Sequence, residues 1–575
     1  MKVSGGEAIV KSLVEHKVKT IYGLPGSHIL SIYDSLRRES RINHILVMHE
    51  VNAAFMADAH GRLTGEPGVC IVTAGAGATN AVTGIAQAYA EASPVVQIAG
   101  HSSTSEKVQP DHSVDDWDFL LKIYQPLTKC SIQIQRVEDI PPVMNKAFTL
   151  ATADRPGPVH LEIPKDVLTS SGKITSFTVN TSAPARSQDI APHVQRVAEV
   201  LESATYPMIA VGKGVLREFC SDEVIRLAKT LCAPILTVPS ALSAIPYKCP
   251  LYLGYDLTGY VHKYGRWLVH PLISSLVKEA DIILTLGFDL GERLTCFKEK
   301  SDRVVHIHHD VSATDYHDEP TSKPLVDVTG SIKCFITSLL KEIKQKHLET
   351  QAMEDRISEI KRTIHDDVAK SIKWGNTPIH PGEISTQLRR VLDDDAIVTL
   401  DTGDSESWMK ICCKAEKSNT ILAPGRYSSM GFSLPAAIAA KINFPERQVV
   451  AVTGDGGFLM SYMDFPTLVK YALSVVVIVE NNRRYGMIWH MQRQMYRGQT
   501  FATEIKTPDL AEYARACGAT GIEVKAPADL KNALEEAVNT SGPVLVAVDT
   551  EYKFPSYLPT RIARWGRAMK SHFPF

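Results

Sequence analysis

Short apolar runs alternate with amphipathic segments along the first third of this chain. Runs at 20–22, 42–48, 69–73 and 95–99 predict strands. The segments that separate them have helical spacing, and we expect helices at 6–15, 29–38, 56–63 and 81–91. Strands that alternate with helices indicate a doubly wound parallel sheet, which binds ligands at the carboxyl ends of its strands.

The same alternation returns twice further along the chain. Strands are predicted at 208–211, 282–286 and 304–307, and again at 397–400, 449–452 and 475–479. We therefore predict an α/β protein with three doubly wound parallel-sheet domains. The expected divisions are a first domain at 1–177, a central domain at 192–345, a helical linker at 346–377, a third domain at 378–550 and a basic tail at 551–575. The alternating charges of 332–373 predict a solvated surface helix.

Composition narrows the class of protein. The chain has 575 residues and a formal net charge of −2, which gives no indication of nucleic acid or of a membrane surface as partner. No apolar run reaches the length of a spanning helix, and the first residues lack the apolar core of a signal peptide. The ten cysteines form no CxxC pair, which favours reduced thiols in the cytoplasm.

The segment 449–487 carries the strongest chemical signal. One apolar run stops at Gly454 and Asp455, and the next stops before Asn482. In a βαβ unit these two turns meet at one edge of the sheet, because the crossover is right-handed. Carboxylate and amide oxygens suit Mg²⁺, and glycine-rich backbone at a helix start suits a diphosphate. Taken singly, each motif could also be an ordinary turn or a helix cap.

Together the two motifs resemble the signature of thiamine diphosphate enzymes, in which GDG is followed at this distance by NN. Here Asn482 follows Asp455 by 27 positions. Further pieces resemble the acetolactate synthase group of these enzymes: YGLPGSHIL, the segment HEVNAAFMADAHGRLTG around Glu50, RPGPVHLEIPKDV and MGFSLPAAIAA. The resemblance runs from about residue 3 to about residue 550. It implies a pyrimidine-binding first domain and a diphosphate-binding third domain.

The resemblance also implies the cofactor ligands by position. Glu50 matches the catalytic glutamate that hydrogen-bonds N1′ of the aminopyrimidine, and Met430 matches the bulky residue beneath the thiazolium. Asp455 and Asn482, with the main-chain oxygen of Arg484, match the ligands of Mg²⁺. The remaining positions implied to bind the cofactor are Gly26, Gly75, Asn80, Gly403, Asp404, Ser405, Ser428, Gly454, Gly456, Gly457, Tyr485, Gly486 and Met487.

Other residues depart from the acetolactate synthase pattern, and these bear on the substrate. His28 resembles the imidazole of benzaldehyde lyases that shuttles a hydroxyl proton, or it is a polar residue at a helix start. Asp115 and Asp116 stand where the family has a glutamine that faces substrate; a solvated loop is the other interpretation. The further substrate candidates are Ser27, Trp489 and Met491.

The function that the resemblance implies is C–C bond cleavage and formation on 2-oxo acids, with decarboxylation followed by carboligation. Alternatives are a benzaldehyde lyase-like carboligase, a 2-hydroxyacyl-CoA lyase, a 2-oxo acid decarboxylase, and a non-catalytic nucleotide-binding member of the family. The family implies a homodimer or a dimer of dimers, with each cofactor held between two chains. In the central domain FAD, an ADP or CoA nucleotide, or no ligand is expected. The basic tail is interpreted as a docked terminal helix or as a lid.

Overall fold

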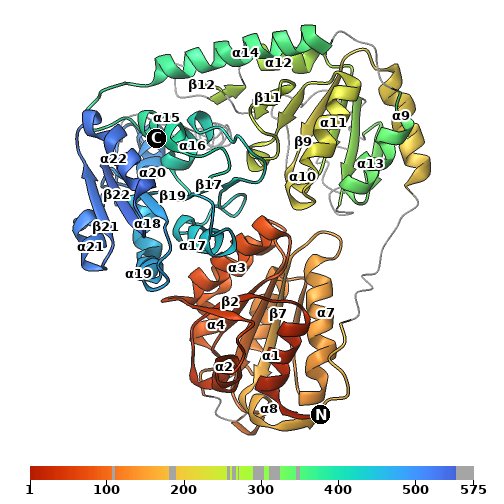
Figure 1. The fold of residues 1–575 in the computed structure, drawn as a ribbon, viewed down its shortest axis with the longest axis vertical. Helices are drawn as coiled ribbons and strands as arrows, with labels where there is room; N and C mark the ends of the chain where they lie inside the picture. Colours follow the sequence, from red (N-terminus) through yellow and green to blue (C-terminus); the bar gives the residue numbers. More distant parts are fainter. Residues whose placement is uncertain are drawn as a thin grey trace. The chain divides into compact units, whose positions relative to one another are not determined.

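The computed structural model describes residues 1–106, 111–179, 190–255, 259–261, 267–269, 271–288, 303–309, 324–344 and 350–551. Within these ranges the chain forms three six-stranded sheets of parallel strands with helices around them, which confirms the predicted α/β fold (Figure 1). The chain divides into two compact units. One holds Met1–Ala185, Pro424–Ala451 and Leu459–Val475, and the other holds Arg186–Ala423, Val452–Phe458 and Val476–Phe575.

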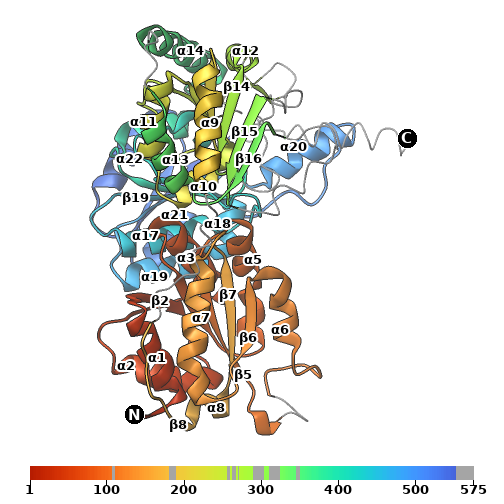
Figure 2. The ribbon, with the colours of Figure 1, turned by 90° about the vertical axis from the view of Figure 1, so that its right-hand side faces the viewer.

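The first sheet has the order β3-β2-β4-β5-β7-β6. Its strands are β2 (Thr20–Gly23), β3 (Asn43–Leu46), β4 (Gly68–Val72), β5 (Val95–His101), β6 (Cys130–Gln133) and β7 (Pro158–Pro164). Its helices are α1 (Gly5–Glu15), α2 (Leu30–Arg37), α3 (Glu50–Thr64), α4 (Ala76–Asn80), α5 (Val82–Ala90), α6 (Phe119–Tyr124), α7 (Ile140–Thr152) and α8 (Lys165–Thr169). Helices α1 and α7 pack together on one face, and α5 and α6 lie on the other (Figure 2). A small antiparallel pair joins β1 (Lys2–Ser4) to β8 (Ser171–Lys173).

Local chemistry explains where two of these helices begin. Helix α1 starts with a capping box, because Ser4 Oγ accepts from the Glu7 N–H and the Glu7 carboxylate accepts from the Ser4 N–H. Helix α3 starts at Glu50, after the N-cap His49, whose ring accepts from the Val51 N–H. The helix predicted from residue 56 therefore begins six residues earlier, because a cap sits where the apolar pattern gives no signal.

Segments from the last third of the chain hold α3 in place within the first unit. Helix α17 (Ser433–Asn443) packs against α3, and the rings of Phe55 and Phe432 meet edge to face at 5.7 Å. Asp464 accepts from the side chain of Asn52 over 2.5 Å and from the Met48 N–H over 2.8 Å. These contacts fix the loop that leads into Glu50.

The central sheet has the order β11-β10-β9-β14-β15-β16. Its strands are β9 (Pro207–Val211), β10 (Ile235–Thr237), β11 (Tyr252–Tyr255), β14 (Ile282–Leu286), β15 (Val304–His308) and β16 (Val326–Thr329). Its helices are α9 (Ala191–Ser203), α10 (Lys213–Arg217), α11 (Ser221–Leu231), α12 (Pro271–Glu279), α13 (Ile332–Glu342) and α14 (Thr350–Ser371). A further antiparallel pair joins β12 (Gly259–Val261) to β13 (Trp267–Val269).

The prediction of one solvated helix at 332–373 was wrong. Two helices lie there, and α13 buries Phe335, Ile336 and Leu339 in the core of the central sheet. Helix α14 contributes Ile357 and Ile360 to the same core. In α14 charges interleave with the buried isoleucines, and the prediction extended this charged pattern to α13, whose apolar face has regular helical spacing.

The third sheet has the order β18-β17-β19-β20-β22-β21. Its strands are β17 (Ile397–Leu400), β18 (Ile421–Leu422), β19 (Val449–Gly454), β20 (Val476–Asn481), β21 (Thr520–Val524) and β22 (Val544–Asp549). In addition to α17, this part of the chain forms the helices α15 (Pro381–Val391), α16 (Asp404–Cys412), α18 (Asp455–Ser461), α19 (Phe465–Lys470), α20 (Gly486–Met495), α21 (Leu510–Ala516) and α22 (Pro527–Asn539). None of the helices in the described ranges is long and apolar enough to cross a membrane. The basic tail predicted at 551–575 lies outside the described residues after Glu551.

Candidate cofactor site

Asp455 is the first residue after β19, and its side chain is 2% exposed. Burial raises the pKa of its carboxyl group to about 6. The Gly456 N–H donates to Oδ1 over 2.9 Å, and main-chain hydrogen bonds from Arg483 and Arg484 limit the rise of this pKa. The turn after β19 is thus bonded to the turn after β20, as expected for neighbouring strands of a parallel sheet.

Two oxygen atoms at these turns suit a cation. Oδ2 of Asp455 is buried and has no hydrogen-bond partner among the described residues. Oδ1 of Asn482 accepts from the Arg484 N–H over 2.9 Å and keeps a second lone pair. A buried carboxylate oxygen without a partner is costly unless a proton or a cation meets it. The residues present therefore fit a hard divalent cation such as Mg²⁺.

The glycines of the Asp455 turn have different surroundings. A Cβ atom at Gly454 would meet nothing within 4 Å, so this backbone is open to a ligand. At Gly456 a Cβ would lie 2.7 Å from the ring of Tyr485, and at Gly457 it would lie 2.8 Å from the Asp401 carboxylate. Close packing therefore accounts for Gly456 and Gly457, whose contact with the diphosphate stays a prediction.

The turn after β17 supplies the predicted residues Gly403, Asp404 and Ser405. Ser405 Oγ is buried without a hydrogen-bond partner in the described part of the chain, which fits an anionic oxygen. A Cβ at Gly486 would lie 2.9 Å from Asp404 Oδ2 and 3.0 Å from Asn482 Nδ2. The side chains of Asp404 and Asn482 therefore both lie beside Gly486. A cation bound near Asn482 would offset the negative charge of Asp404.

Glu480, which the sequence analysis missed, lies next to these groups. It is 3% exposed, and its Oε1 has no hydrogen-bond partner among the described residues. Burial, and then the charge of Asp404, raise the pKa of Glu480 to about 8. Glu480 directly follows the apolar run 475–479, and an acidic residue at the end of a buried strand could have marked it as a candidate.

The helix after Asn482 carries the substrate candidates Trp489 and Met491. Trp489 is 7% exposed, and the guanidinium groups of Arg493 and Arg484 lie 4.7 Å and 5.5 Å from its ring centroid. Met491 is partly buried, as are Tyr485 and Met487. Trp489 thus packs against two cations, and its role toward substrate stays a prediction.

Glu50 lies in the first unit, at the carboxyl edge of the first sheet. It is 7% exposed, and its Oε2 accepts from Asn80 Nδ2 over 3.0 Å. Its Oε1 lies 3.2 Å from where a Cβ would stand on Gly77. Thr73 Oγ1, beside the same glycine, is buried without a hydrogen-bond partner within the described ranges. The structure thus brings Glu50 and Asn80 into contact, and their roles toward a cofactor stay predictions.

His28 lies at the same edge, in the turn after β2. It is 2% exposed, and its Nδ1 lies 3.1 Å from Ser27 Oγ. Its ring centroid is 4.7 Å from that of His112, which the sequence analysis did not select. Burial, and then the neighbouring His112, lower the pKa of His28. Gly75 allows the His112 loop to approach, because a Cβ there would lie 2.2 Å from the His112 carbonyl oxygen.

Gly26 and Thr73 connect His28 to Glu50. A Cβ at Gly26 would lie 2.4 Å from Cβ of Thr73, whose methyl group also lies beside Gly77. The turns after β2 and β4 are therefore in close contact. His28 lies on the turn after β2, and Glu50 begins the neighbouring helix α3. Both are at the same edge of the first sheet.

Asp115 and Asp116 are both exposed. Lys122 donates to Asp116 over 2.5 Å, and this contact lowers the pKa of Asp116. The surroundings match the solvated-loop interpretation. The neighbouring Trp117 does point inward, with its ring 4.1 Å from that of His101.

Ser428 and Met430 also belong to the first unit. Ser428 is exposed with φ of 59°, and its hydroxyl donates to the Gly425 carbonyl oxygen over 3.0 Å. Met430 is partly buried. Their predicted contacts with the pyrimidine and the thiazolium stay predictions.

Comparison with known proteins agrees with this arrangement. Residues 3–119 match the N-terminal TPP binding domain of thiamine pyrophosphate enzymes, 194–339 their central domain, and 401–548 their C-terminal TPP binding domain. The chain is 31% identical to a probable acetolactate synthase large subunit of Methanocaldococcus jannaschii, over 97% of this chain and 94% of the relative. It is also 31% identical to an acetolactate synthase of Bacillus subtilis, over 96% and 94%. A third relative, the acetolactate synthase isozyme 3 large subunit of Escherichia coli, is 31% identical over 93% and 92%.

The resemblance found in the motifs therefore extends over nearly the whole length of this chain and of its relatives. The first and third sheets along the chain, which carry Glu50 and Asp455, are those that match the TPP binding domains. The chain belongs to the thiamine diphosphate-dependent enzymes of the acetolactate synthase group.

Proposed function

We propose that this chain, with thiamine diphosphate and Mg²⁺, removes CO₂ from a 2-oxo acid of the pyruvate type and joins the remaining fragment to a second carbonyl compound. The observation that carries the proposal is the buried Asp455, whose Oδ2 has no partner among the described residues and fits a cation. The names of the relatives support the reaction, since they are acetolactate synthases.

Different residues are proposed to bind the Mg²⁺ ion and the diphosphate. Asp455 and Asn482, with the main-chain oxygen of Arg484, would hold Mg²⁺. Gly454 and the turn at Gly403 and Ser405 would donate to the diphosphate, since Gly454 is open and the Ser405 hydroxyl has no other partner in the described chain. When bound, the thiamine group supplies a thiazolium carbon that adds to carbonyls and takes up electrons as CO₂ leaves.

Glu50 is proposed to hold the proton that activates the aminopyrimidine. Its Oε2 already accepts from Asn80, which leaves Oε1 as the atom that carries or releases the proton. Glu50 is only 7% exposed, so little water competes for this hydrogen bond, which strengthens it. His28 is proposed to move a proton to or from a substrate hydroxyl, because its lowered pKa keeps the imidazole neutral and able to accept.

A carboligase that takes aldehydes is a second candidate function. The buried His28, paired with His112, supports it. The acyl-CoA lyase alternative rests on the basic tail, which lies outside the described residues. Product analysis with pyruvate, benzaldehyde or formyl-CoA, each with and without thiamine diphosphate, separates these candidates. Product formation that does not depend on thiamine diphosphate, or no rise in Tm with thiamine diphosphate and Mg²⁺, would contradict the proposal.

FAD in the central domain is an open part of the proposal. The glycines of its strand ends are accounted for by packing, since a Cβ at Gly212 would lie 2.4 Å from the Gly287 carbonyl oxygen, and one at Gly214 would lie 2.7 Å from Gly287 Cα. They therefore carry no weight for a nucleotide. Flavin absorbance of the purified protein decides between FAD and its absence.

The assembly proposed is a homodimer or a dimer of dimers, with Glu50 of one chain and Asp455 of the other at each cofactor. Sedimentation velocity measures the assembly. The cytoplasm is the proposed location, supported by cysteines that are free thiols throughout the described ranges.

A further inference from the structure

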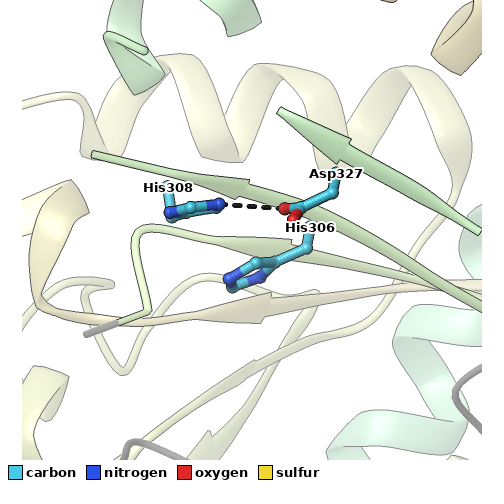
Figure 3. A group of neighbouring side chains, drawn as sticks. All are labelled: His306, His308 and Asp327. Atoms are coloured by element: carbon cyan, nitrogen blue, oxygen red, sulfur yellow. Dashed lines mark hydrogen bonds and ion pairs between the residues drawn. The ribbon is translucent and has the colours of Figure 1, made fainter. Parts of the chain in front are cut away.

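Three side chains of metal-ligating type meet on the central sheet, which carries neither Asp455 nor Glu50. They are His306 and His308 of β15 and Asp327 of β16. One ligand atom from each lies within 4.8 Å of the others. Figure 3 shows the two imidazoles side by side, with the Asp327 carboxylate at the nitrogen of His308.

The strand geometry brings these groups to one face. His306 and His308 are two positions apart on β15, so both point to the same side of the sheet. Asp327 is the register partner of His306 on the parallel neighbour β16. The alternate residues Val305 and Ile307 are fully buried in the core on the opposite side.

The hydroxyl group of Thr285 contacts the imidazole of His306. Thr285 Oγ1 lies 3.3 Å from the Val305 carbonyl oxygen, to which it donates, and 2.6 Å from His306 Nδ1. When the hydroxyl gives its one proton to that carbonyl, it accepts from His306, and Nδ1 carries the hydrogen. Nε2 of His306 then carries the lone pair that a metal ion needs. Metal-binding histidines are commonly oriented in this way by a partner on the second nitrogen.

His308 and Asp327 form the other side of the cluster. His308 Nε2 lies 2.9 Å from Asp327 Oδ1, with the His308 side chain 0% exposed and that of Asp327 30% exposed. Nδ1 of His308 has no hydrogen-bond partner among the described residues. The two rings stack with centroids 4.4 Å apart, so a positive charge on both would be repulsive.

We propose that His306, His308 and Asp327 bind a divalent transition metal ion of the Zn²⁺ type, with a fourth position open to water. The ion takes the place of the proton on His308 Nε2, and the neutral ring then carries its one proton on Nδ1, by exchange with solvent. Zn–N and Zn–O bonds of about 2.0 Å place tetrahedral ligands about 3.3 Å apart, so the 2.9 Å pair widens by a few tenths of an ångström. Two imidazoles and one carboxylate favour such an ion over Mg²⁺, which prefers oxygen ligands.

The test uses Co²⁺ as a probe, because its visible absorption reports nitrogen ligands in a four-coordinate site. The full chain is saturated with thiamine diphosphate and Mg²⁺ so that the Asp455 site is filled. The expected result is one Co²⁺ per chain, displaced by Zn²⁺, in wild type and in Asp455→Asn alike. His306→Ala and Asp327→Asn should each weaken binding at least tenfold.

Two further variants separate ligation from folding. Thr285→Val keeps the shape of the side chain, loses the hydroxyl that orients His306, and should weaken Co²⁺ binding by about tenfold. His193→Ala removes an exposed histidine of α9 and should change nothing. Wild-type affinity in both His306→Ala and Asp327→Asn, or no Co²⁺ bound by the folded wild type, would overturn the proposal.

Discussion

The side-chain amide of Asn80 donates a hydrogen bond of 3.0 Å to Oε2 of Glu50. Asn80 ends α4 and Glu50 begins α3, so two helix termini at one sheet edge fix a buried carboxyl group. Because one oxygen is held, the proton that Glu50 exchanges is confined to the other.

Removing this carboxyl group should abolish most of the activity. Glu50→Gln cannot exchange a proton at Oε1, and kcat with pyruvate should fall by about 10²- to 10⁴-fold. Asn80→Ala removes the hydrogen bond that holds Oε2 of Glu50, and kcat should fall by about 10-fold or more. Thr79→Ala, on the same helix, is the matched control and should keep wild-type activity. Undiminished product formation by Glu50→Gln would contradict the proposed role of Glu50.

The imidazole pair predicts a shift in the pH profile. Burial and His112 both hold the pKa of His28 below its ordinary value, with Lys165 acting in the same direction and Asp111 and Glu106 opposing it. His112→Ala removes the ring that lowers the pKa of His28 and admits water, so this pKa should rise. If His28 accepts a proton, the acid limb of kcat/KM moves to higher pH in His112→Ala and changes form in His28→Ala. An unmoved acid limb in His112→Ala would refute the coupling.

A buried ion pair in the first sheet predicts a pH dependence of stability. Glu162 Oε1 lies 2.9 Å from His101 Nε2, and both side chains are almost fully buried. Burial opposes charge on both groups, but their mutual contact prevails, raising the pKa of His101 and lowering that of Glu162. The His101 contribution is present below its unfolded pKa of about 6.5 and is lost as pH rises through the folded value. The Glu162 contribution is present above about 4.3 and is lost as pH falls through its folded value.

The pair should therefore stabilise the fold most between about pH 4.3 and 6.5. Glu162→Gln should lower the free energy of unfolding by about 3–5 kcal/mol in that window, and by less at pH above the raised pKa of His101. Tm measured across this range checks the prediction, with the exposed Glu66→Gln as control. A decrease in Tm that is the same at every pH would argue against the pair.

The three sheets and the location of the cofactor motifs could be predicted from the sequence, because apolar runs and turn residues are local signals. Residues brought together by distant segments gave no such signal. His112 lies in a loop with no periodicity, and only the fold brings its ring to His28. Gly456 and Gly457 look like a phosphate loop in sequence, yet they pack against Tyr485 and Asp401, which lie elsewhere in the chain. The burial of α13 was missed because 332–373 was treated as one charged helix, although most of its charges lie in α14 and the apolar face of α13 is regular.

The proposed sharing of each cofactor between two chains can be tested by mixing inactive variants. Glu50→Gln inactivates the part of a site that the first domain supplies, and Asp455→Asn inactivates the part that binds the cation. If each site takes Glu50 from one chain and Asp455 from the other, a mixed dimer has one site with both changes and one intact site. Unfolding and refolding the two variants together in equal amounts should then restore about a quarter of wild-type activity, since about half of the dimers are mixed and each has one working site.

The control is each variant refolded alone, which should stay inactive, together with a mixture that is never unfolded. A site built from a single chain predicts the opposite, because every site in the mixed dimer would then carry one of the two changes. Activity that fails to return, although sedimentation shows dimers of mixed composition, would rule out the shared site. The same samples give a second reading, since thiamine diphosphate and Mg²⁺ should raise Tm in the mixed dimers more than in Asp455→Asn alone.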